Sequence, residues 1–271
     1  MTAKNARNLK RDDRRDAIAQ AVMEHGALRI EDLAARFDIS LMTVHRDLDE
    51  LVERGILRKS RGVATALAST LVESSIVYRQ GQRLATKRAM AATALEYVEA
   101  GQSVFLDDST TVLQIVPLLR ERTPLTVITN SLFVVNEVGT MPRISLIALG
   151  GTFHNWCGSF MGRMTNDAIH KLRGDVLIMS APAITDGTLY FQAPETVDTK
   201  RAMLDAAGTK ILLVDHTKFK GRALHALADL NEFDVVIVDA GMSEAEISAL
   251  RAEGINIVVA PAVPDHPTQL S

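Results

Sequence analysis

Apolar residues recur at helical spacing three times near the start of the chain. The stripes predict helices at about residues 13–24 and 30–37 and from Ser40 to Gly55. Ser40 is a suitable N-cap, and the third helix is expected to turn these apolar residues inward: Leu41, Val44, Leu48, Leu51 and Val52. Residues 56–64 predict two short strands around a basic turn. The pattern therefore predicts a small helical core followed by a wing.

From residue 102 onward, apolar runs alternate with helical patterns. Strands are predicted at 103–107, 125–129, 144–149, 175–180, 210–215, 234–239 and 256–260, and helices at 110–122, 131–138, 164–173, 194–207 and 243–252. Strands that are apolar throughout and separated by helices indicate an α/β domain with a mostly parallel sheet, covered on both faces. The region 67–101 is predicted to be mainly helical, with a break near Gly81. The expected organisation is a helical domain with a wing at residues 1–66, a helical linker at residues 67–101 and an α/β domain at residues 102–271.

Composition narrows the class of protein. With 271 residues, 47% of them hydrophobic, the chain can build two cores. No apolar run approaches the roughly 20 residues of a membrane span, and the charged start lacks the core of a secretory signal, so a cytoplasmic protein is expected. Cys157 is the single cysteine, which leaves no intrachain disulfide and no cysteine pair for zinc. We expect a buried apolar thiol, and no metal or cofactor.

Charge is distributed unevenly along the chain. The net charge is −3, but residues 1–65 hold 13 Lys or Arg against 11 Asp or Glu. A basic arm leads the chain, and its members are Lys4, Arg7, Lys10, Arg11, Arg14 and Arg15. Such an arm fits either contact with nucleic acid or a solvated tail.

The third predicted helix has the features of a DNA-reading helix. With its apolar face inward, four residues near its N-terminus are exposed, namely Met42, Thr43, His45 and Arg46. Arg46 can pair with a guanine edge or a phosphate, and the Ser40 hydroxyl lies where a phosphate would approach. Three wing residues, Arg58, Lys59 and Arg61, would add contacts to the DNA backbone. The alternative is an ordinary amphipathic helix in which Arg46 pairs with Glu50.

Polar residues gather where the predicted strands end, which is where open parallel sheets bind ligands. They are Asp107, Asp108, Ser109, Thr110 and Thr111 after the first strand, Thr129 and Asn130 after the second, and Gly150 and Gly151 after the third. Hydroxyls and helix amides hold phosphate well, and Lys200 and Lys218 could add positive charge. Each group also has a structural explanation as a helix cap, a tight turn or a solvated lysine.

The N-terminal motif resembles the DeoR family of bacterial regulators. The residues that carry the resemblance are Ser40, Thr43, Val44, Arg46, Asp47, Leu48, Leu51, Gly55, Leu57 and Arg58. It implies a winged helix-turn-helix that binds duplex DNA. This chain has His45 where the family usually has an arginine, and its wing reads Ser60, Arg61, Gly62, Val63 in place of the common motif.

The resemblance continues to about Leu250. Residues 107–111, 127–131, 149–151, 197–201 and 214–219 match the family's later blocks. It implies an effector-sensing domain similar in fold to ribose-5-phosphate isomerase and coenzyme A transferases, which in many members senses a sugar phosphate. Two departures are Ser109, in place of the loop glycine, and residues 180–185, which lack the usual aspartate.

Three hypotheses follow. The favoured one is a ligand-controlled regulator, most simply a repressor of a carbohydrate-catabolic operon, which binds an operator in double-stranded DNA and responds to a phosphorylated sugar-like metabolite. The second is a sugar-phosphate isomerase-like or transferase-like enzyme with a DNA-binding appendage, and the third is a partner-binding adaptor. Because one reading helix contacts few base pairs, a homodimer or homotetramer is expected. No catalytic residues and no membrane contact are expected.

Overall fold

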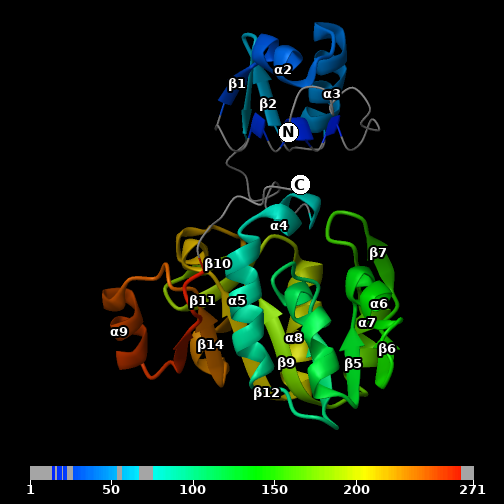
Figure 1. The fold of residues 1–271 in the computed structure, drawn as a ribbon, viewed down its shortest axis with the longest axis vertical. Helices are drawn as coiled ribbons and strands as arrows, with labels where there is room; N and C mark the ends of the chain where they lie inside the picture. Colours follow the sequence, from blue (N-terminus) through cyan, green and yellow to red (C-terminus); the bar gives the residue numbers. More distant parts are fainter. Residues whose placement is uncertain are drawn as a thin grey trace. The chain divides into compact units, whose positions relative to one another are not determined.

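The computed structural model describes residues 14–15, 17–19, 21–22, 27–53, 57–66 and 76–263. The chain divides into two compact units, Met1–Arg79 and Gln80–Ser271 (Figure 1). This boundary differs from the expected one, because much of the predicted linker 67–101 belongs to the second unit. Among the described residues, no helix combines the length and apolar character needed to cross a membrane.

The first unit joins short helices to a small antiparallel sheet. Its elements are β1 (Ala27–Arg29), α2 (Ile30–Phe37), α3 (Leu41–Glu53), β2 (Leu57–Ser60) and β3 (Val63–Ala66). The described residues of the predicted first helix, 14–15, 17–19 and 21–22, are helical as well. The strands pair antiparallel in the order β1-β3-β2. The predicted wing is therefore confirmed, and β1 adds a strand that the apolar pattern did not reveal.

The core of the first unit forms where the three helical stripes meet. Ile18, Leu33 and Leu48 are fully buried there, together with other apolar residues of α2 and α3. The expectation that Leu41 and Val52 also point inward is wrong, since they are 49% and 38% exposed. Leu41 lies on the first turn of α3, and Val52 is rotated by about 100° from the residue before it, which is buried.

The second unit contains a seven-stranded parallel sheet. Its strands are β4 (Ser103–Leu106), β5 (Leu125–Thr129), β6 (Ile144–Ala148), β9 (Gly174–Ser180), β12 (Ala207–Val214), β14 (Val235–Val238) and β15 (Ile257–Val259). Their order is β15-β14-β12-β9-β4-β5-β6, and every pairing is parallel. All seven predicted strands are found, and the α/β prediction is confirmed.

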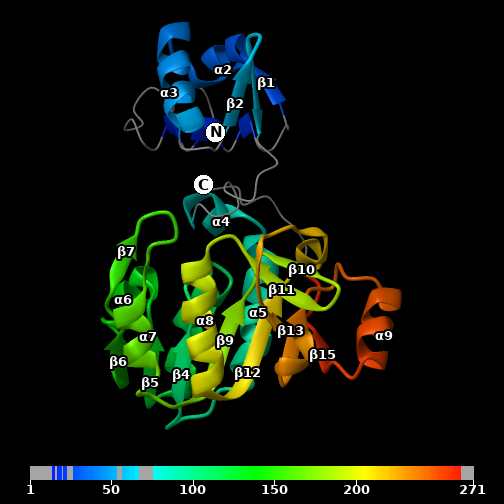
Figure 2. The ribbon, with the colours of Figure 1, turned by 180° about the vertical axis from the view of Figure 1, so that it is seen from behind.

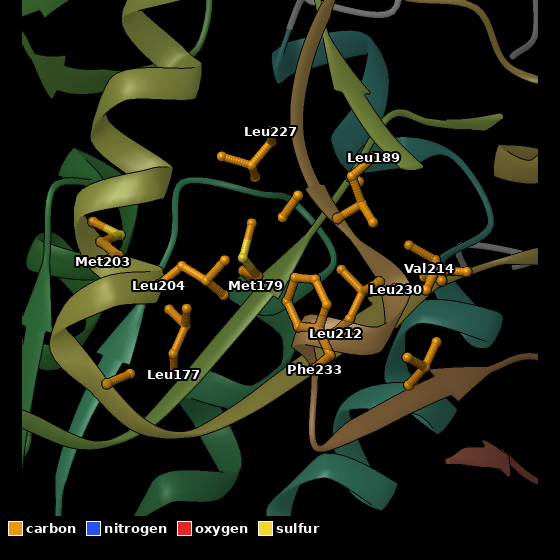
Figure 3. Packing of buried hydrophobic residues seen from close by; sticks show 14 of the residues in the cluster. Leu177, Met179, Leu189, Met203, Leu204, Leu212, Val214, Leu227, Leu230 and Phe233 are labelled. Atoms are coloured by element: carbon orange, nitrogen blue, oxygen red, sulfur yellow. The ribbon is translucent and has the colours of Figure 1, made fainter. Parts of the chain in front are cut away.

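Helices cover both faces of this sheet. The helices of this part of the chain are α4 (Ile76–Gly81), α5 (Leu84–Leu95), α6 (Leu132–Val138), α7 (Arg163–Ile169), α8 (Pro194–Ala206) and α9 (Glu244–Ala252), and its 3-10 segments are η2 (Val112–Arg122), η3 (His216–Lys220) and η4 (Leu230–Glu232). Figures 1 and 2 show α5 and α8 on opposite faces. Successive residues of β9 divide between two cores accordingly: Leu177 and Met179 pack with α8, and Val176 and Ile178 pack with α5. Figure 3 shows the core on the α8 side.

Two small antiparallel sheets were not predicted. One consists of β10 (Ala183–Thr185), β11 (Thr188–Phe191) and β13 (His225–Asp229), and the other of β7 (Thr152–His154) and β8 (Ser159–Met161). Asp186 and Gly187 form the β10–β11 turn with positive φ angles of 48° and 76°, which suits a tight hairpin. The predicted helix 110–122 is the 3-10 segment η2, which contains Pro117. A proline lacks the N–H that an α-helix requires at that point.

Candidate DNA-contact surface and effector site

The N-terminal half of α3 presents a polar surface away from the core. The Ser40 hydroxyl accepts a hydrogen bond from the Thr43 backbone N–H at 3.2 Å and so caps the helix. Met42, His45 and Arg46 are exposed, and Thr43 is half-buried. Met42 is 65% exposed, which is unusual for a large apolar side chain. The four residues predicted to read DNA thus share one side of the helix start.

A buried ion pair that the sequence analysis missed holds α3 in place. Asp47 is 1% exposed, and it accepts hydrogen bonds from Arg14 Nε at 2.7 Å and from Arg15 Nε at 3.3 Å. Arg15 Nη2 also lies 3.5 Å from Glu50, the residue considered as a partner for Arg46. Two members of the predicted basic arm therefore serve the internal structure. The other four lie outside the described residues.

The wing turn projects basic side chains. Arg61 and Gly62 form the turn between β2 and β3 with φ angles of 49° and 77°, and Arg58 and Arg61 are exposed. Lys59 Nζ instead contacts the Asp49 carboxylate and lies 3.5 Å from His45 Nδ1, both on α3. Lys59 thus links the wing to the helix start, and Arg58 and Arg61 remain as its outward cations.

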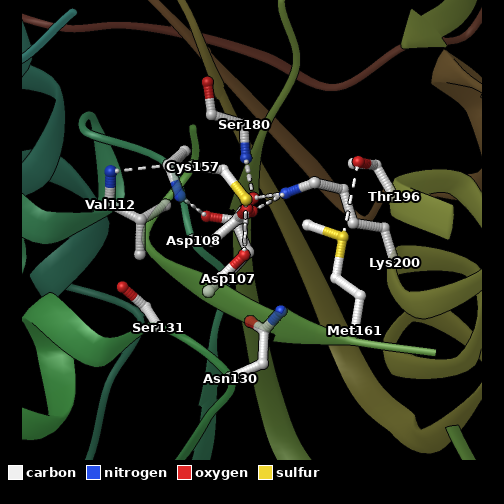
Figure 4. Close-up of polar contacts among 12 residues, drawn as sticks. Asp107, Asp108, Val112, Asn130, Ser131, Cys157, Met161, Ser180, Thr196 and Lys200 are labelled. Carbon is white, nitrogen blue, oxygen red and sulfur yellow. Dashed lines mark hydrogen bonds and ion pairs between the residues drawn. The ribbon is translucent and has the colours of Figure 1, made fainter. Parts of the chain in front are cut away.

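In the second unit, a buried ion triad lies where β4 ends. Lys200 Nζ on α8 donates hydrogen bonds to Asp107 at 2.5 Å and to Asp108 at 2.8 Å (Figure 4). Asp107 also accepts the backbone N–H groups of Ser109 and Ser180, at 2.9 and 3.0 Å. Burial alone would lower the pKa of the Lys200 ammonium, but the two carboxylates outweigh that effect and raise it. Lys200 is therefore a charged group that is paired with both carboxylates.

The triad extends toward the β7–β8 hairpin. Ser159 Oγ donates to the second oxygen of Asp108 at 3.0 Å. Cys157 Sγ lies 2.9 Å from the same hydroxyl and is completely buried. Since the Ser159 hydrogen is used on Asp108, its oxygen can only accept, and the Cys157 thiol hydrogen has two acceptors within reach, this oxygen and the His154 carbonyl at 3.5 Å. The predicted buried thiol is confirmed, and it belongs to a polar network.

The segment after β5 combines helix capping with one unsatisfied atom. Ser131 Oγ caps α6, and Thr129 Oγ1 accepts the Ser131 N–H at 3.1 Å. Asn130 Nδ2 donates to the Phe160 carbonyl at 2.9 Å. Asn130 is 2% exposed, and its Oδ1 has no hydrogen-bond partner.

The loop after β4 caps the segment η2 and contacts a buried lysine. Ser109 Oγ accepts the Val112 N–H at 3.1 Å and so caps η2. Lys87 Nζ, on α5, donates to Thr110 Oγ1 at 3.0 Å although this lysine is only 5% exposed. The sequence analysis missed Lys87. Its spacing of three, four and seven residues from Met90, Ala91 and Ala94 would have placed it on the buried face of α5.

The remaining predicted residues lie elsewhere at the strand ends. A Cβ on Gly151 would stand 2.1 Å from Thr165 Oγ1, and Gly150 O accepts a hydrogen bond from that hydroxyl at 2.8 Å, so both glycines adjoin α7. Lys218 belongs to a cluster after β12, and β9 separates β12 from β4. There, burial by itself would raise the pKa of the Asp215 carboxyl. The charges of Lys218 and Arg83 and the hydrogen bonds from Thr217 have the larger combined effect, so the pKa is lowered.

The cluster after β12 is held by Arg83, at the start of α5. Its guanidinium donates to Asp239 at 3.0 Å and lies 3.7 Å from Asp215. His216 Nδ1 lies 2.8 Å from Asp239. Within the described ranges, His, Cys, Asp and Glu side chains form no group of three or more suited to a metal ion.

Comparison with known proteins identifies both units. Residues 14–70 match the DeoR-like helix-turn-helix domain, and residues 82–240 match the DeoR C-terminal sensor domain. The chain belongs to the DeoR family. It is 30% identical over 233 residues to the glycerol-3-phosphate regulon repressor of Escherichia coli, covering 86% of this chain and 92% of that one. It is also 30% identical over 230 residues to the lactose phosphotransferase system repressor of Staphylococcus epidermidis, covering 84% and 91%.

Among solved structures, the DeoR-family chain is similar to ribose 5-phosphate isomerase A from Methanocaldococcus jannaschii. The sequence identity is 16%, the TM-score is 0.37, and the match covers 53% of this chain and 56% of that one.

Proposed function

We propose that the chain is a sequence-specific DNA-binding repressor of an operon for carbohydrate use, whose affinity for its operator falls when a phosphorylated sugar-like effector binds. It would act in the cytoplasm as a homodimer or homotetramer. The observation that carries the proposal is the exposed set Met42, His45 and Arg46 on a capped helix of a helix-turn-helix unit. The relatives support the class of operon, since one is a glycerol-3-phosphate regulon repressor and the other a lactose phosphotransferase system repressor.

On DNA, α3 would enter the major groove with its first turns at the base edges. Arg46 would pair with a guanine or a phosphate, and Met42 would contact a thymine methyl group. Arg58 and Arg61 on the wing would contact phosphates. The Asp49–Lys59 contact would fix the wing against the helix, so that both approach the duplex as one surface.

In the second unit, the effector's phosphate would lie at the loop after β4, held by Thr110, Thr111 and Lys87. The arrangement supports binding over catalysis, because a general base needs a carboxylate that can take up a proton. Asp107 accepts hydrogen bonds from three donors, one of which is a buried ammonium group. The protein's own donors therefore already engage this carboxylate.

The test is fluorescence anisotropy on a labelled duplex that the wild-type chain selects from a random library. We expect Arg46→Ala to weaken binding to that duplex about 10- to 100-fold, the effect of one base-reading contact. The matched control is Arg173→Ala, an exposed arginine of the second unit. Titration with sugar phosphates is expected to release the duplex. Failure to select any duplex at moderate salt would refute the DNA-binding proposal.

A further inference from the structure

Asn130 carries a buried acceptor that the protein itself does not satisfy. Its side chain is 2% exposed, and Oδ1 has no hydrogen-bond partner. The orientation of the amide is fixed, because its Nδ2 atom lies 2.9 Å from the Phe160 backbone carbonyl, which can only accept a hydrogen bond. A buried acceptor without a donor is costly and rare in folded proteins. A donor that enters from outside the chain would satisfy this atom.

The position of Asn130 connects it to the ion triad. The backbone carbonyl of Asn130 accepts a hydrogen bond from the Phe160 backbone N–H at 2.9 Å, and the hydroxyl of the neighbouring Ser159 donates to Asp108. Two adjacent residues of β8 thus hold Asn130 on one side and Asp108 on the other. Figure 4 shows the Asn130 amide directed toward the carboxylates of the triad. The acceptor belongs to the same site as the loop after β4.

Charge defines what could approach this acceptor. The carboxylates of Asp107 and Asp108 are matched in formal charge by the two buried lysines of the site, Lys200 and Lys87. Asn130 Oδ1 adds a partial negative charge. A phosphate oxygen at Oδ1 would bring two acceptors together, whereas a hydroxyl or ammonium hydrogen would complete the hydrogen bonding.

We propose that Asn130 Oδ1 is a subsite for a hydrogen-bond donor, a hydroxyl or an ammonium group, on the non-phosphate part of the effector. The inference rests on the proposed function for the placement of the phosphate at Thr110 and Lys87. On this proposal, Asn130 distinguishes phosphate esters that carry a hydrogen-bond donor at this position from those that do not. A ligand without a donor at this position would leave the buried acceptor unmet and would bind more weakly.

Calorimetric titration of the full chain with three small esters tests the subsite. Glycerol 3-phosphate offers hydroxyls, O-phosphoethanolamine offers an ammonium group, and propyl phosphate offers neither. We expect one or both donor esters to bind about tenfold or more tightly than propyl phosphate. Asn130→Leu, which keeps the branched shape of the side chain and removes its polar atoms, is expected to bring the ratio close to one. Asn136→Leu, at an exposed position of α6, is the matched control and should keep the preference.

The outcomes separate the two proposals. Equal binding of all three esters by the unmodified chain would overturn the donor subsite and leave the phosphorylated effector in place, and this comparison does not depend on the folding of any variant. A preference that survives in Asn130→Leu would also overturn the subsite. Glycerol that binds as tightly as glycerol 3-phosphate, with both lost in Asn130→Leu, would keep the subsite and overturn the phosphate part of the proposed function. If neither the esters nor glycerol bind, both are wrong.

Discussion

Lys200→Met removes the cation of the triad and leaves two carboxylates buried together. Asp107 and Asp108 are 1% and 6% exposed, so water cannot replace the lost ammonium group. Breaking a buried ion pair by removing one partner costs about 3–5 kcal/mol. With an m value of roughly 2 kcal/mol/M in urea, the unfolding midpoint should fall by about 1.5–2.5 M.

The single tryptophan, Trp156, makes this measurement specific to the second unit. It lies within Gln80–Ser271, so its fluorescence reports the unfolding of that unit. Lys171→Met, at an exposed lysine, is the control and should shift the free energy of unfolding by less than about 0.5 kcal/mol.

The dependence on pH separates charge from packing. In the variant, burial and mutual repulsion should raise the carboxylate pKa values, so one proton is taken up in the folded state. The stability deficit should therefore shrink as the pH falls from 8 to 5. In the wild type the raised pKa of Lys200 keeps its contribution intact below about pH 10 and removes it only as the pH rises through the folded value. A midpoint within 0.5 M of the wild type at pH 8, or a deficit that does not change with pH, would refute the reasoning.

Three further changes probe other contacts. Arg58→Ala should weaken binding to all duplexes alike and reduce the slope of log affinity against log salt by about one, as measured by anisotropy at several salt concentrations. Asp47→Asn leaves Arg15 buried beside a neutral amide and should destabilise the first unit by about 3 kcal/mol, visible as earlier thermal loss of helical circular dichroism. For Asp215, burial by itself would raise the pKa, but Lys218 and the other neighbours have the larger effect and lower it overall. The stabilisation that Asp215 contributes is therefore present above about pH 4 and lost as the pH falls. Asp215→Asn should flatten that acid loss in urea midpoints measured between pH 3 and 5.

The large sheet could be predicted because its strands are apolar along their whole length. The four residues of β14 are all buried, and a short run that is apolar throughout is typical of a strand covered on both faces. The strands of the β7–β8 hairpin have three residues each, too few to show a period of two. Their pairing depends on contacts with the rest of the unit, which no local pattern contains.

The sequence indicated which types of residue form the candidate site, but not which of them pair with one another. Asp107 and Lys200 stand 93 positions apart, and nothing in their spacing indicates that they form an ion pair. Lys87 was missed because a lysine on an apolar helix face usually buries its methylene stem and keeps its ammonium group in water, whereas this ammonium group is buried as well. The orphan Oδ1 of Asn130 is not visible in any sequence motif, since it depends on which side of the amide the neighbouring hairpin satisfies.

The two units therefore use charge in different ways. On the first unit, Arg46, Arg58 and Arg61 are exposed, which suits contact with an external anion such as a DNA backbone. In the second unit, Lys200 is matched internally by the loop that the sequence assigns to phosphate. A metabolite that binds there must be recognised through hydrogen bonds of the correct polarity more than through net charge. Selectivity among small metabolites then depends on atoms such as Asn130 Oδ1, whose unmet hydrogen bond penalises a ligand that lacks the donor.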